Sequence, residues 1–176
     1  MEEELTSEMF VNSVYHVKCG KAVVFNHKKF TDQQLSTRGG TDKDTEKLKE
    51  TLKKFNFKVD IKEDQSLEEI KTCLNAFSAK KHEDIDAILV AVLTHGDEEG
   101  LYDRDGSVYD PQEVLCRPFT QENKTLAGKP KIFLISACRG SKVSLNLISK
   151  LRENCSSGRL RTSDGSSWWS PVLTHP

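Results

Sequence analysis

Short apolar runs alternate with amphipathic segments along most of the chain. The runs are rich in β-branched and aromatic side chains and are bounded by polar residues, glycine or proline, as strands are. The expected strands cover residues 21–25, 57–61, 87–94 and 132–135. Between the first three runs, apolar residues recur at helical spacing, which predicts one helix that begins at Thr41 and another that begins near Ser66.

Signals for helix starts and turns support this order of elements. Thr41 is followed three residues later by Asp44, and Ser66-Leu-Glu-Glu69 forms a capping box ahead of an apolar helix face. Residues 101–109 predict a β-hairpin that turns at Asp105-Gly106. Strands that alternate with helices in this way predict an α/β fold, with a mainly parallel β-sheet covered by helices on both faces.

Composition and charge narrow the classes of function. The chain has 176 residues, a hydrophobic content of 36% and a formal net charge of −1, which suits one domain with a modest core. Acidic and basic residues are interspersed, so the sequence gives no support for binding to nucleic acid or to an anionic membrane surface. The start of the chain has no signal-peptide pattern, and the longest apolar run, from Ala87 to Leu93, is too short to span a membrane.

The cysteines are scattered and odd in number: Cys19, Cys73, Cys116, Cys138 and Cys155. None forms a C-x-x-C pair, so neither a disulfide framework nor a zinc site is expected, and a reducing cytosol fits best. The aspartates of the 101–109 hairpin lack the ligand spacing and the closing glutamate of a calcium loop. We therefore expect a cytoplasmic protein with no metal and no cofactor.

The character of the chain changes after Gly140. Clusters of serine, glycine and arginine follow, with both tryptophans and no run that clearly predicts a core strand. We divide the chain into a short N-terminal segment (residues 1–14), one catalytic domain (residues 15–140) and a divergent, mobile tail (residues 141–176). Within the tail, Val143, Leu147 and Leu151 are spaced to line one face of a short helix.

Two polar side chains follow strands of the expected sheet at the point where each strand ends. His95 follows the 87–94 run, and Cys138 follows the 132–135 run. Because the carboxyl ends of parallel strands share one edge of a sheet, the two residues can meet as a nucleophile and its base. Gly96 lets the backbone approach closely, so its N–H and that of Cys138 can form an oxyanion hole. Taken singly, each residue also fits a structural role, as a buried thiol or a solvated strand-end histidine.

The sequence around these residues resembles the caspase family. Ser136-Ala-Cys-Arg-Gly140 and Thr94-His-Gly96 are similar to the family's cysteine and histidine signatures. Arg38-Gly-Gly-Thr-Asp42 is similar to its Arg-x-Gly-Thr-Asp motif, and Lys21-Ala-Val-Val-Phe-Asn26 and Gly128-Lys-Pro-Lys131 fit the same family. The similarity covers roughly residues 15–140 and corresponds to the catalytic large subunit of a caspase.

The resemblance implies a cysteine endopeptidase that cleaves after aspartate, is made as a zymogen and acts in apoptosis-related proteolysis. It implies that Cys138 attacks the scissile carbonyl, that His95 handles the proton of the leaving amine, and that the amides of Gly96 and Cys138 hold the oxyanion. Arg38 would form half of the pocket for the substrate aspartate, with Ser136 as a second binding residue. The implied fold is the three-layer caspase sandwich, here truncated on its C-terminal side.

Two departures from the family pattern keep a second function open. Ser136 stands where the family has glutamine, and its side chain is too short to place a donor at the same point. Nothing in residues 141–176 matches the small subunit, which in the family supplies the second pocket arginine, the remaining strands and the dimer interface. We therefore expect the 132–135 strand to lie on an unpaired edge and the chain to be inactive alone.

The expected partners are protein substrates with Asp at the cleavage site, a small subunit and a caspase-type dimer partner. The alternative function is that of a non-catalytic caspase-like regulator, or a truncated isoform, that binds true caspases. The intact His95–Cys138 pair and Arg38 favour the protease, whereas Ser136 and the tail favour the regulator.

Overall fold

A five-stranded sheet organises the fold. The computed structural model describes residues 15–120, 123–139 and 142–149, and for residues 138–139 and 142–149 it describes the backbone alone. The sheet has the strand order β2-β1-β3-β6-β7, in which β1, β2, β3 and β6 are parallel and β7 is antiparallel to β6. The strands are β1 (Gly20–Asn26), β2 (Phe57–Glu63), β3 (Ala87–Leu93), β6 (Lys131–Arg139) and β7 (Lys142–Ser149).

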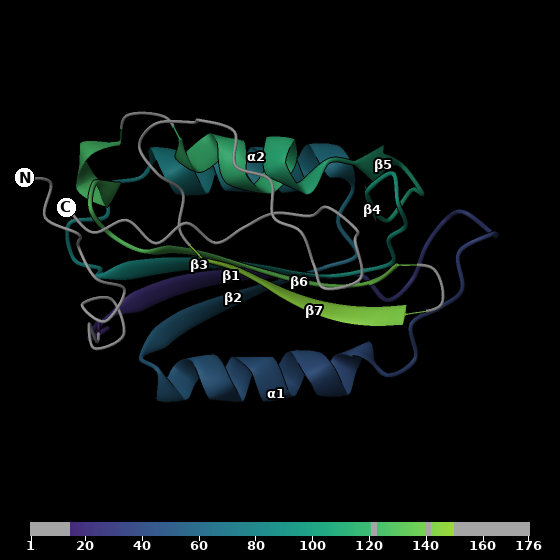
Figure 1. The fold of residues 1–176 in the computed structure, drawn as a ribbon, viewed down its shortest axis with the longest axis horizontal. Helices are drawn as coiled ribbons and strands as arrows, with labels where there is room; N and C mark the ends of the chain where they lie inside the picture. The colour runs from purple at the N-terminus through teal and green to yellow at the C-terminus, as the bar shows by residue number, and fades with distance from the viewer. Residues whose placement is uncertain (1–14, 121–122, 140–141, 150–176) are drawn as a thin grey trace, which may run out of the picture.

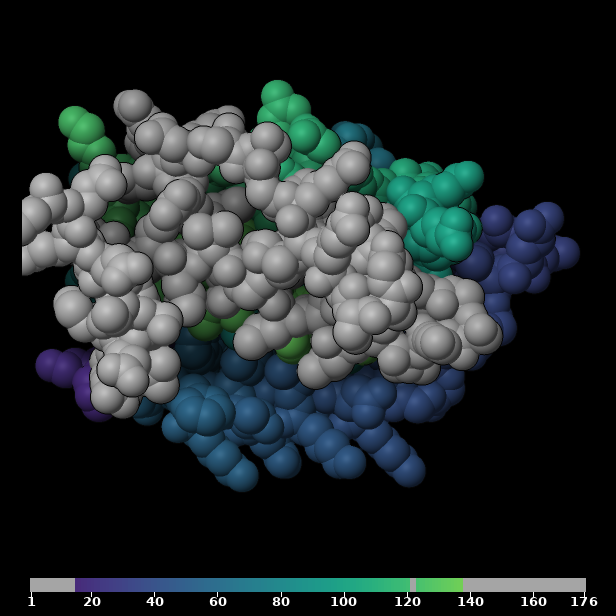
Figure 2. Space-filling model, in the orientation of Figure 1, coloured from purple at the N-terminus to yellow at the C-terminus, as the bar shows by residue number. Residues whose placement is uncertain are grey.

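Two helices cross from strand to strand on opposite faces of the sheet. α1 (Thr41–Lys54) joins β1 to β2, and α2 (Leu67–Ala79) joins β2 to β3. Figure 1 shows α1 below the sheet and α2 above it, and the side chains of α1 project in blue from the lower side of the space-filling view (Figure 2). The α/β fold with a mainly parallel sheet is thereby confirmed. No described helix is both long enough and apolar enough to cross a membrane.

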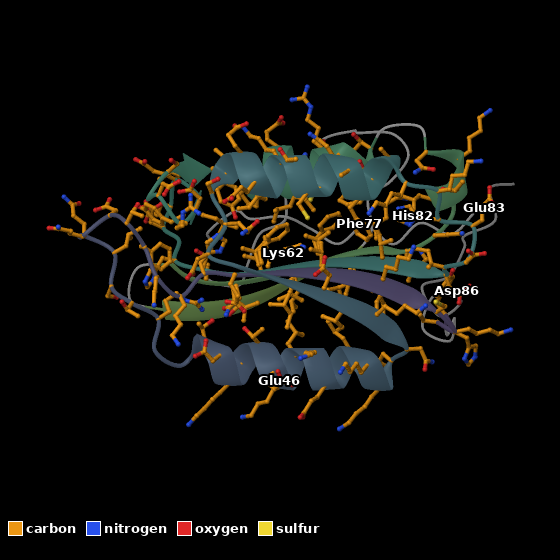
Figure 3. The ribbon with its side chains drawn as sticks, turned by 180° about the vertical axis from the view of Figure 1, so that it is seen from behind. Glu46, Lys62, Phe77, His82, Glu83 and Asp86 are labelled. Atoms are coloured by element: carbon orange, nitrogen blue, oxygen red, sulfur yellow. The ribbon has the colours of Figure 1, made fainter. Side chains whose placement is uncertain are left out.

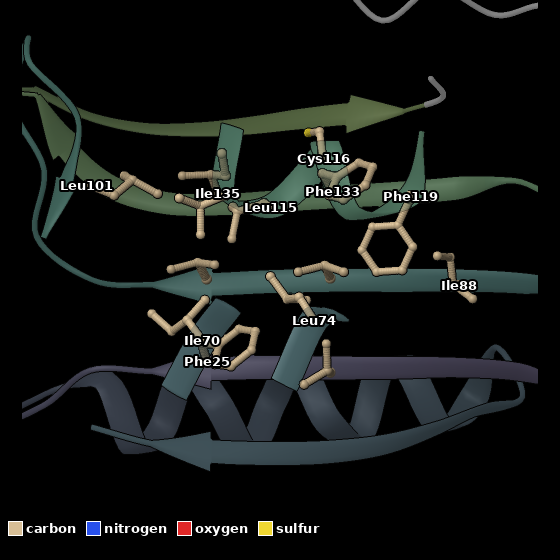
Figure 4. Packing of buried hydrophobic residues seen from close by; sticks show 14 of the residues in the cluster. Phe25, Ile70, Leu74, Ile88, Leu101, Leu115, Cys116, Phe119, Phe133 and Ile135 are labelled. Carbon is tan, nitrogen blue, oxygen red and sulfur yellow. The ribbon is translucent and has the colours of Figure 1, made fainter. Parts of the chain in front are cut away.

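β3 shows why the sheet needs helices on both faces. All of its residues are buried, and they alternate between two apolar clusters. The cluster on the α2 side includes Ile88, Ile70 and Phe133 (Figure 4), and the cluster on the α1 side includes Leu89 and Leu52. A strand that is covered on both faces needs a continuous apolar run, because either orientation of a side chain leads into the core.

The two crossover helices begin in different ways. At α2, the hydroxyl of Ser66 accepts a hydrogen bond from the N–H of Glu69, and the Glu69 carboxylate accepts one from the N–H of Ser66 at 2.8 Å. This is the capping box that the sequence predicts. α1 begins at Thr41 as expected, but its N-cap residue is Gly40 and no side chain caps the helix. The Thr41 hydroxyl donates instead to the side chain of Asn26.

The connection from β3 to β6 starts with the predicted hairpin. β4 (Leu101–Tyr102) and β5 (Val108–Tyr109) form an antiparallel pair. The buried carboxylate of Asp103 accepts hydrogen bonds of 2.7–2.9 Å from two N–H groups of the turn and from the N–H of Leu67, which fastens the hairpin to α2. Three short helical turns lead on to β6: Gln112–Cys116, Arg117–Phe119 and Lys124–Leu126.

β7 corrects two expectations. It is a strand over residues 142–149, within the predicted tail, and the helix predicted from Val143, Leu147 and Leu151 is wrong over those residues. Leu151 and the rest of the predicted mobile tail lie outside the described residues. β7 also pairs with β6 along its length, so the expected unpaired edge of β6 is covered. Val143, Leu145 and Leu147 also alternate at strand spacing. Pairing with β6 provides hydrogen-bond partners for the backbone of this segment, whereas a short isolated helix is only marginally stable.

Candidate active site

The carboxyl ends of β1, β3 and β6 meet at one edge of the sheet. The N–H of His27, directly after β1, donates to the carbonyl of Leu93 at 2.8 Å. The N–H of Thr94, directly after β3, donates to the carbonyl of Ser136 at 3.0 Å. These two bonds hold the ends of three neighbouring strands together, at the edge where α/β proteins usually bind ligands.

The imidazole of His95 is half-buried at this edge and is held by the site loop, which we define as residues 28–38. Its Nε2 lies 2.7 Å from the carbonyl oxygen of Ser36. Because a carbonyl oxygen can only accept, Nε2 carries the proton, and the Nδ1 of the neutral ring keeps its lone pair. The ring of Phe30 lies against the imidazole, with ring centroids 4.9 Å apart. Nδ1 is therefore the atom that can take a proton from a nucleophile.

The backbone around His95 is fixed by the following hairpin. The His95 carbonyl accepts from the N–H of Tyr102 at 3.0 Å, and the Thr94 hydroxyl donates to the Tyr102 carbonyl at 2.6 Å. Gly96 and Leu101 face each other as an antiparallel bridge pair. The hydrogen bonds of this bridge are made by their neighbours: the N–H of Asp97 donates to the carbonyl of Gly100, and the N–H of Tyr102 donates to the carbonyl of His95. Among the described residues, the bridge itself does not use the N–H of Gly96, which the predicted oxyanion hole needs as a donor.

Cys138 lies near the end of β6, on the strand next to the one that His95 follows. A Cβ atom placed on Gly96 would lie 3.2 Å from the Cβ of Ala137, the residue before Cys138. The backbone thus brings the predicted base and the predicted nucleophile to the same place. The side chain of Cys138 lies outside the described part of the structure, so its contact with His95 stays a prediction.

Arg38 ends the site loop and is anchored at the same sheet edge. Its Nη1 donates to the carbonyl of His27 at 2.8 Å and to the hydroxyl of Thr41 at 2.9 Å. The Thr41 hydroxyl in turn donates to the buried side chain of Asn26, and the N–H of Arg38 closes the loop by donating to the carbonyl of Lys28 at 3.0 Å. These bonds fix the position of the guanidinium, whose contact with a substrate aspartate stays a prediction.

Ser136, the other predicted binding residue, is half-buried in β6. It pairs in register with Leu93 of β3 and with Leu145 of β7, two positions before Cys138. The structure therefore gathers His95, Gly96 and the strand that carries Ser136 and Cys138 at one edge. Arg38 joins them through the loop that binds His95, and the binding role of Ser136 stays a prediction.

Two contacts of the site have no signal in the sequence. Ser36 contributes its backbone carbonyl, a group that every residue carries, so residue type gives no hint of it. Phe30 is a lone loop aromatic, and its contact with His95 depends on the path of the site loop. The sequence feature that comes closest to predicting these contacts is the Arg38-Gly-Gly-Thr-Asp42 motif. It locates the end of the site loop but does not show which residues the loop contacts.

A pocket lies away from the residues of this edge, between α2 and the strands β1 and β2. It has a volume of about 390 Å³, and its lining includes Lys62, Phe77 and Cys73. Figure 3 shows Lys62 and Phe77 in the space between the sheet and α2. Burial raises the pKa of the Cys73 thiol, which lowers its thiolate fraction at neutral pH. Among the described residues, the lining contains no histidine to act as a base, so this pocket is a poorer candidate.

Two further histidines have structural roles. Nε2 of His27 lies 2.9 Å from the Gln65 carbonyl, and Nε2 of His82 lies 2.7 Å from the Phe77 carbonyl. Burial lowers the pKa of both rings, which keeps them neutral at pH 7. Within the described ranges, no three His, Cys, Asp or Glu side chains are grouped so that they would hold a metal ion.

Comparisons with known proteins identify the family and the fold. The family described as "Caspase domain" matches residues 19–167. Caspase-1 of Spodoptera frugiperda is 38% identical over 128 residues, which cover 73% of this chain and 42% of that protein. Caspase-7 of Gallus gallus is 34% identical over 142 residues, 78% of this chain and 45% of that protein. The crystal structure of caspase-1 from Spodoptera frugiperda matches with a TM-score of 0.65 at 39% identity and covers 70% of this chain and 48% of that chain.

The structure is an α/β domain in which His95 follows β3 and Cys138 lies near the end of the neighbouring strand β6. The family match extends over most of the sequence, and the chain belongs to the caspase family. The resemblance found from the cysteine, histidine and arginine motifs is therefore confirmed. The chain spans less than half the length of the curated relatives described above.

Proposed function

We propose that this chain is the large, catalytic part of a caspase-type cysteine endopeptidase, which cleaves protein substrates after aspartate in apoptosis-related proteolysis. The observation that carries the proposal is the 2.7 Å contact between Nε2 of His95 and the carbonyl of Ser36. It supports Nδ1 as the proton acceptor, at the edge where β6 ends with Cys138. We also propose that the protein is cytoplasmic, since an odd number of scattered cysteines with no C-x-x-C pair suits a reducing compartment.

In the proposed reaction, Nδ1 of His95 takes the proton of the Cys138 thiol, and the sulfur attacks the scissile carbonyl carbon. The carbonyl electron pair moves onto oxygen, and the N–H groups of Gly96 and Cys138 stabilise the oxyanion. The tetrahedral intermediate collapses to a thioester as His95 gives its proton to the leaving amine. A water molecule, deprotonated by His95, then hydrolyses the thioester and the thiol is restored.

Arg38 is the proposed group for the aspartate side chain of the substrate, because a guanidinium forms strong, charge-assisted hydrogen bonds with a carboxylate. It lies in the same loop as Ser36, so a single loop sets the distance between the specificity group and the base. Since the chain covers 42–45% of its relatives, we propose that a small subunit and a caspase-type dimer partner complete the groove after activation of a zymogen.

The test is an assay with a fluorogenic peptide that ends in aspartate, using this chain alone and mixed with a separately produced caspase small subunit. We expect turnover in the mixture, none with the chain alone, and none in the mixture made with Cys138→Ser. A matched peptide that ends in asparagine should not be cleaved, because it lacks the charge that Arg38 would bind. Turnover that survives Cys138→Ser, or that prefers the asparagine peptide, contradicts the proposal.

A second candidate function is that of a non-catalytic regulator that binds active caspases. The observation in its favour is Ser136, which stands where the family has glutamine. If this function is correct, the chain binds an active caspase equally well with and without Cys138→Ser and shows no turnover with a small subunit. Cysteine-dependent turnover in the mixture decides for the protease.

A further inference from the structure

We propose that Phe30 is a positioning residue for the catalytic base: its ring fixes the plane of the His95 imidazole while the Ser36 carbonyl fixes Nε2. This inference rests on the proposed function of His95. The ring centroids of Phe30 and His95 lie 4.9 Å apart, with the ring planes inclined by 36°. Contacts of this kind are common between aromatic rings and favour particular relative orientations.

Both contacts are needed because each restrains a different motion of the imidazole. The hydrogen bond from Nε2 to the Ser36 carbonyl holds one atom of the His95 ring at 2.7 Å from its acceptor. That bond alone still allows the ring to tilt about the line from its Cβ atom to Nε2, and such a tilt would move Nδ1. The ring of Phe30, placed against the imidazole, opposes that rotation.

Phe30 can act as a fixed support because the backbone on both sides of it is tied down. The N–H of Lys29 donates to a carboxylate oxygen of Asp64 at 3.0 Å, and the N–H of Thr31 donates to the carbonyl of Arg104 at 2.9 Å. On the sheet side, the Phe30 ring stacks on the buried ring of His27, with centroids 6.3 Å apart and planes inclined by 23°. The phenyl ring thus has ring contacts with both a structural histidine and the proposed base.

The chemistry gives a reason for an aromatic ring at this place. Proton transfer from Cys138 turns His95 into an imidazolium, and an aromatic face attracts a nearby cation. Proton transfer also depends steeply on geometry, since a misplacement of about 1 Å can cost on the order of 100-fold in rate. Phe30 therefore supports the base in both respects, by holding its orientation and by lying against the charged form.

The experiment measures the rate at which iodoacetamide alkylates Cys138 in the full chain, followed by peptide mass spectrometry at pH 7. Phe30→Leu and Phe30→Met remove the ring but keep apolar volume, and Phe30→Tyr keeps the ring. Phe55→Leu is the matched control, because Phe55 is 63% exposed and lies at the far end of α1. We expect the rate of Cys138 alkylation to fall about tenfold in the Leu and Met variants and to stay at the wild-type value in the Tyr variant and the control.

A spectroscopic readout separates positioning from a general loss of stability. The ring protons of His95 should show an aromatic ring-current shift by NMR that disappears in Phe30→Leu and remains in Phe30→Tyr. Wild-type alkylation rates in both the Leu and the Met variant overturn the positioning role, provided that His95→Ala slows alkylation of Cys138. If His95→Ala itself leaves that rate unchanged, the proposed function fails and the role of Phe30 fails with it.

Discussion

Thr41→Val tests how the sheet edge holds the site loop. The Thr41 side chain is 2% exposed, and its hydroxyl both donates to the buried side chain of Asn26 and accepts from Nη1 of Arg38 at 2.9 Å. Valine has nearly the same shape but no hydroxyl, so the substitution removes both bonds and adds little steric change. The Asn26 oxygen then loses the donor that Thr41 provides, at a place with no exposure to water.

The substitution lowers the unfolding free energy because it leaves a buried acceptor without this donor. Such a loss typically costs about 1–3 kcal/mol. The bond to Arg38 adds little, because that guanidinium is half-exposed and keeps its contact with the His27 carbonyl. For a chain of this size, unfolding free energy falls by about 2 kcal/mol per molar urea. The midpoint of urea unfolding should therefore fall by about 0.5–1.5 M.

The assay is urea unfolding of the whole chain, followed by circular dichroism. Thr51→Val is the matched control, because Thr51 lies on the exposed side of the same helix and its hydroxyl donates to the Lys47 carbonyl at 2.8 Å. The control should change the unfolding free energy by less than about 0.5 kcal/mol. Equal midpoints for Thr41→Val and Thr51→Val would refute the argument that the buried Thr41–Asn26 bond stabilises this edge.

Three further predictions concern the core, acid stability and the substrate pocket. Phe133→Ala, at a fully buried position, should lower the unfolding free energy by about 3–5 kcal/mol in urea titrations, whereas Phe55→Ala, at an exposed one, should leave it nearly unchanged. Asp86 accepts two backbone N–H bonds of 2.8 and 2.9 Å that lower its pKa, so the stability it adds is present at pH 7. That contribution is lost as the pH falls from 3.8, the ordinary pKa of the group, through the lower pKa of the folded state. The urea midpoints of wild type and Asp86→Ala should therefore converge in this pH range. A difference between them that does not change with pH argues against this role of Asp86. In the mixture with a small subunit, Ser136→Gln should raise kcat/KM for the aspartate peptide by roughly 5- to 150-fold, and an unchanged value argues against the pocket assignment.

The strands and helices that bury apolar faces could be predicted from the sequence. β3 has the continuous apolar run of a doubly covered strand, and the capping box at Ser66 marks the start of α2. β7 could not be predicted, because Val143 and Leu147 fit a helix face and a strand face equally well. The choice depends on the neighbouring edge of β6, which is a contact between separate segments and not a local property of residues 142–149.

The candidate site shows the same division between residue type and position. His95 and Arg38 carry reactive or charged groups at motif positions, so the sequence identifies them and the structure places both at one sheet edge. The partners that orient His95 are a backbone carbonyl and a loop phenyl ring, from Ser36 and Phe30. Neither group is distinctive in sequence, because their effect comes from the path of the site loop.

The central claim is that His95 activates Cys138, and the pH dependence of thiol alkylation tests it most directly. The full chain is treated with limiting iodoacetamide from pH 6 to pH 9, and each cysteine is quantified by mass spectrometry in wild type and in His95→Gln. We predict that Cys138 is labelled first and stays reactive at pH 6, and that His95→Gln abolishes this advantage. Earlier labelling of Cys19, Cys73 or another thiol, or a Cys138 profile that is the same in both proteins, would contradict the account.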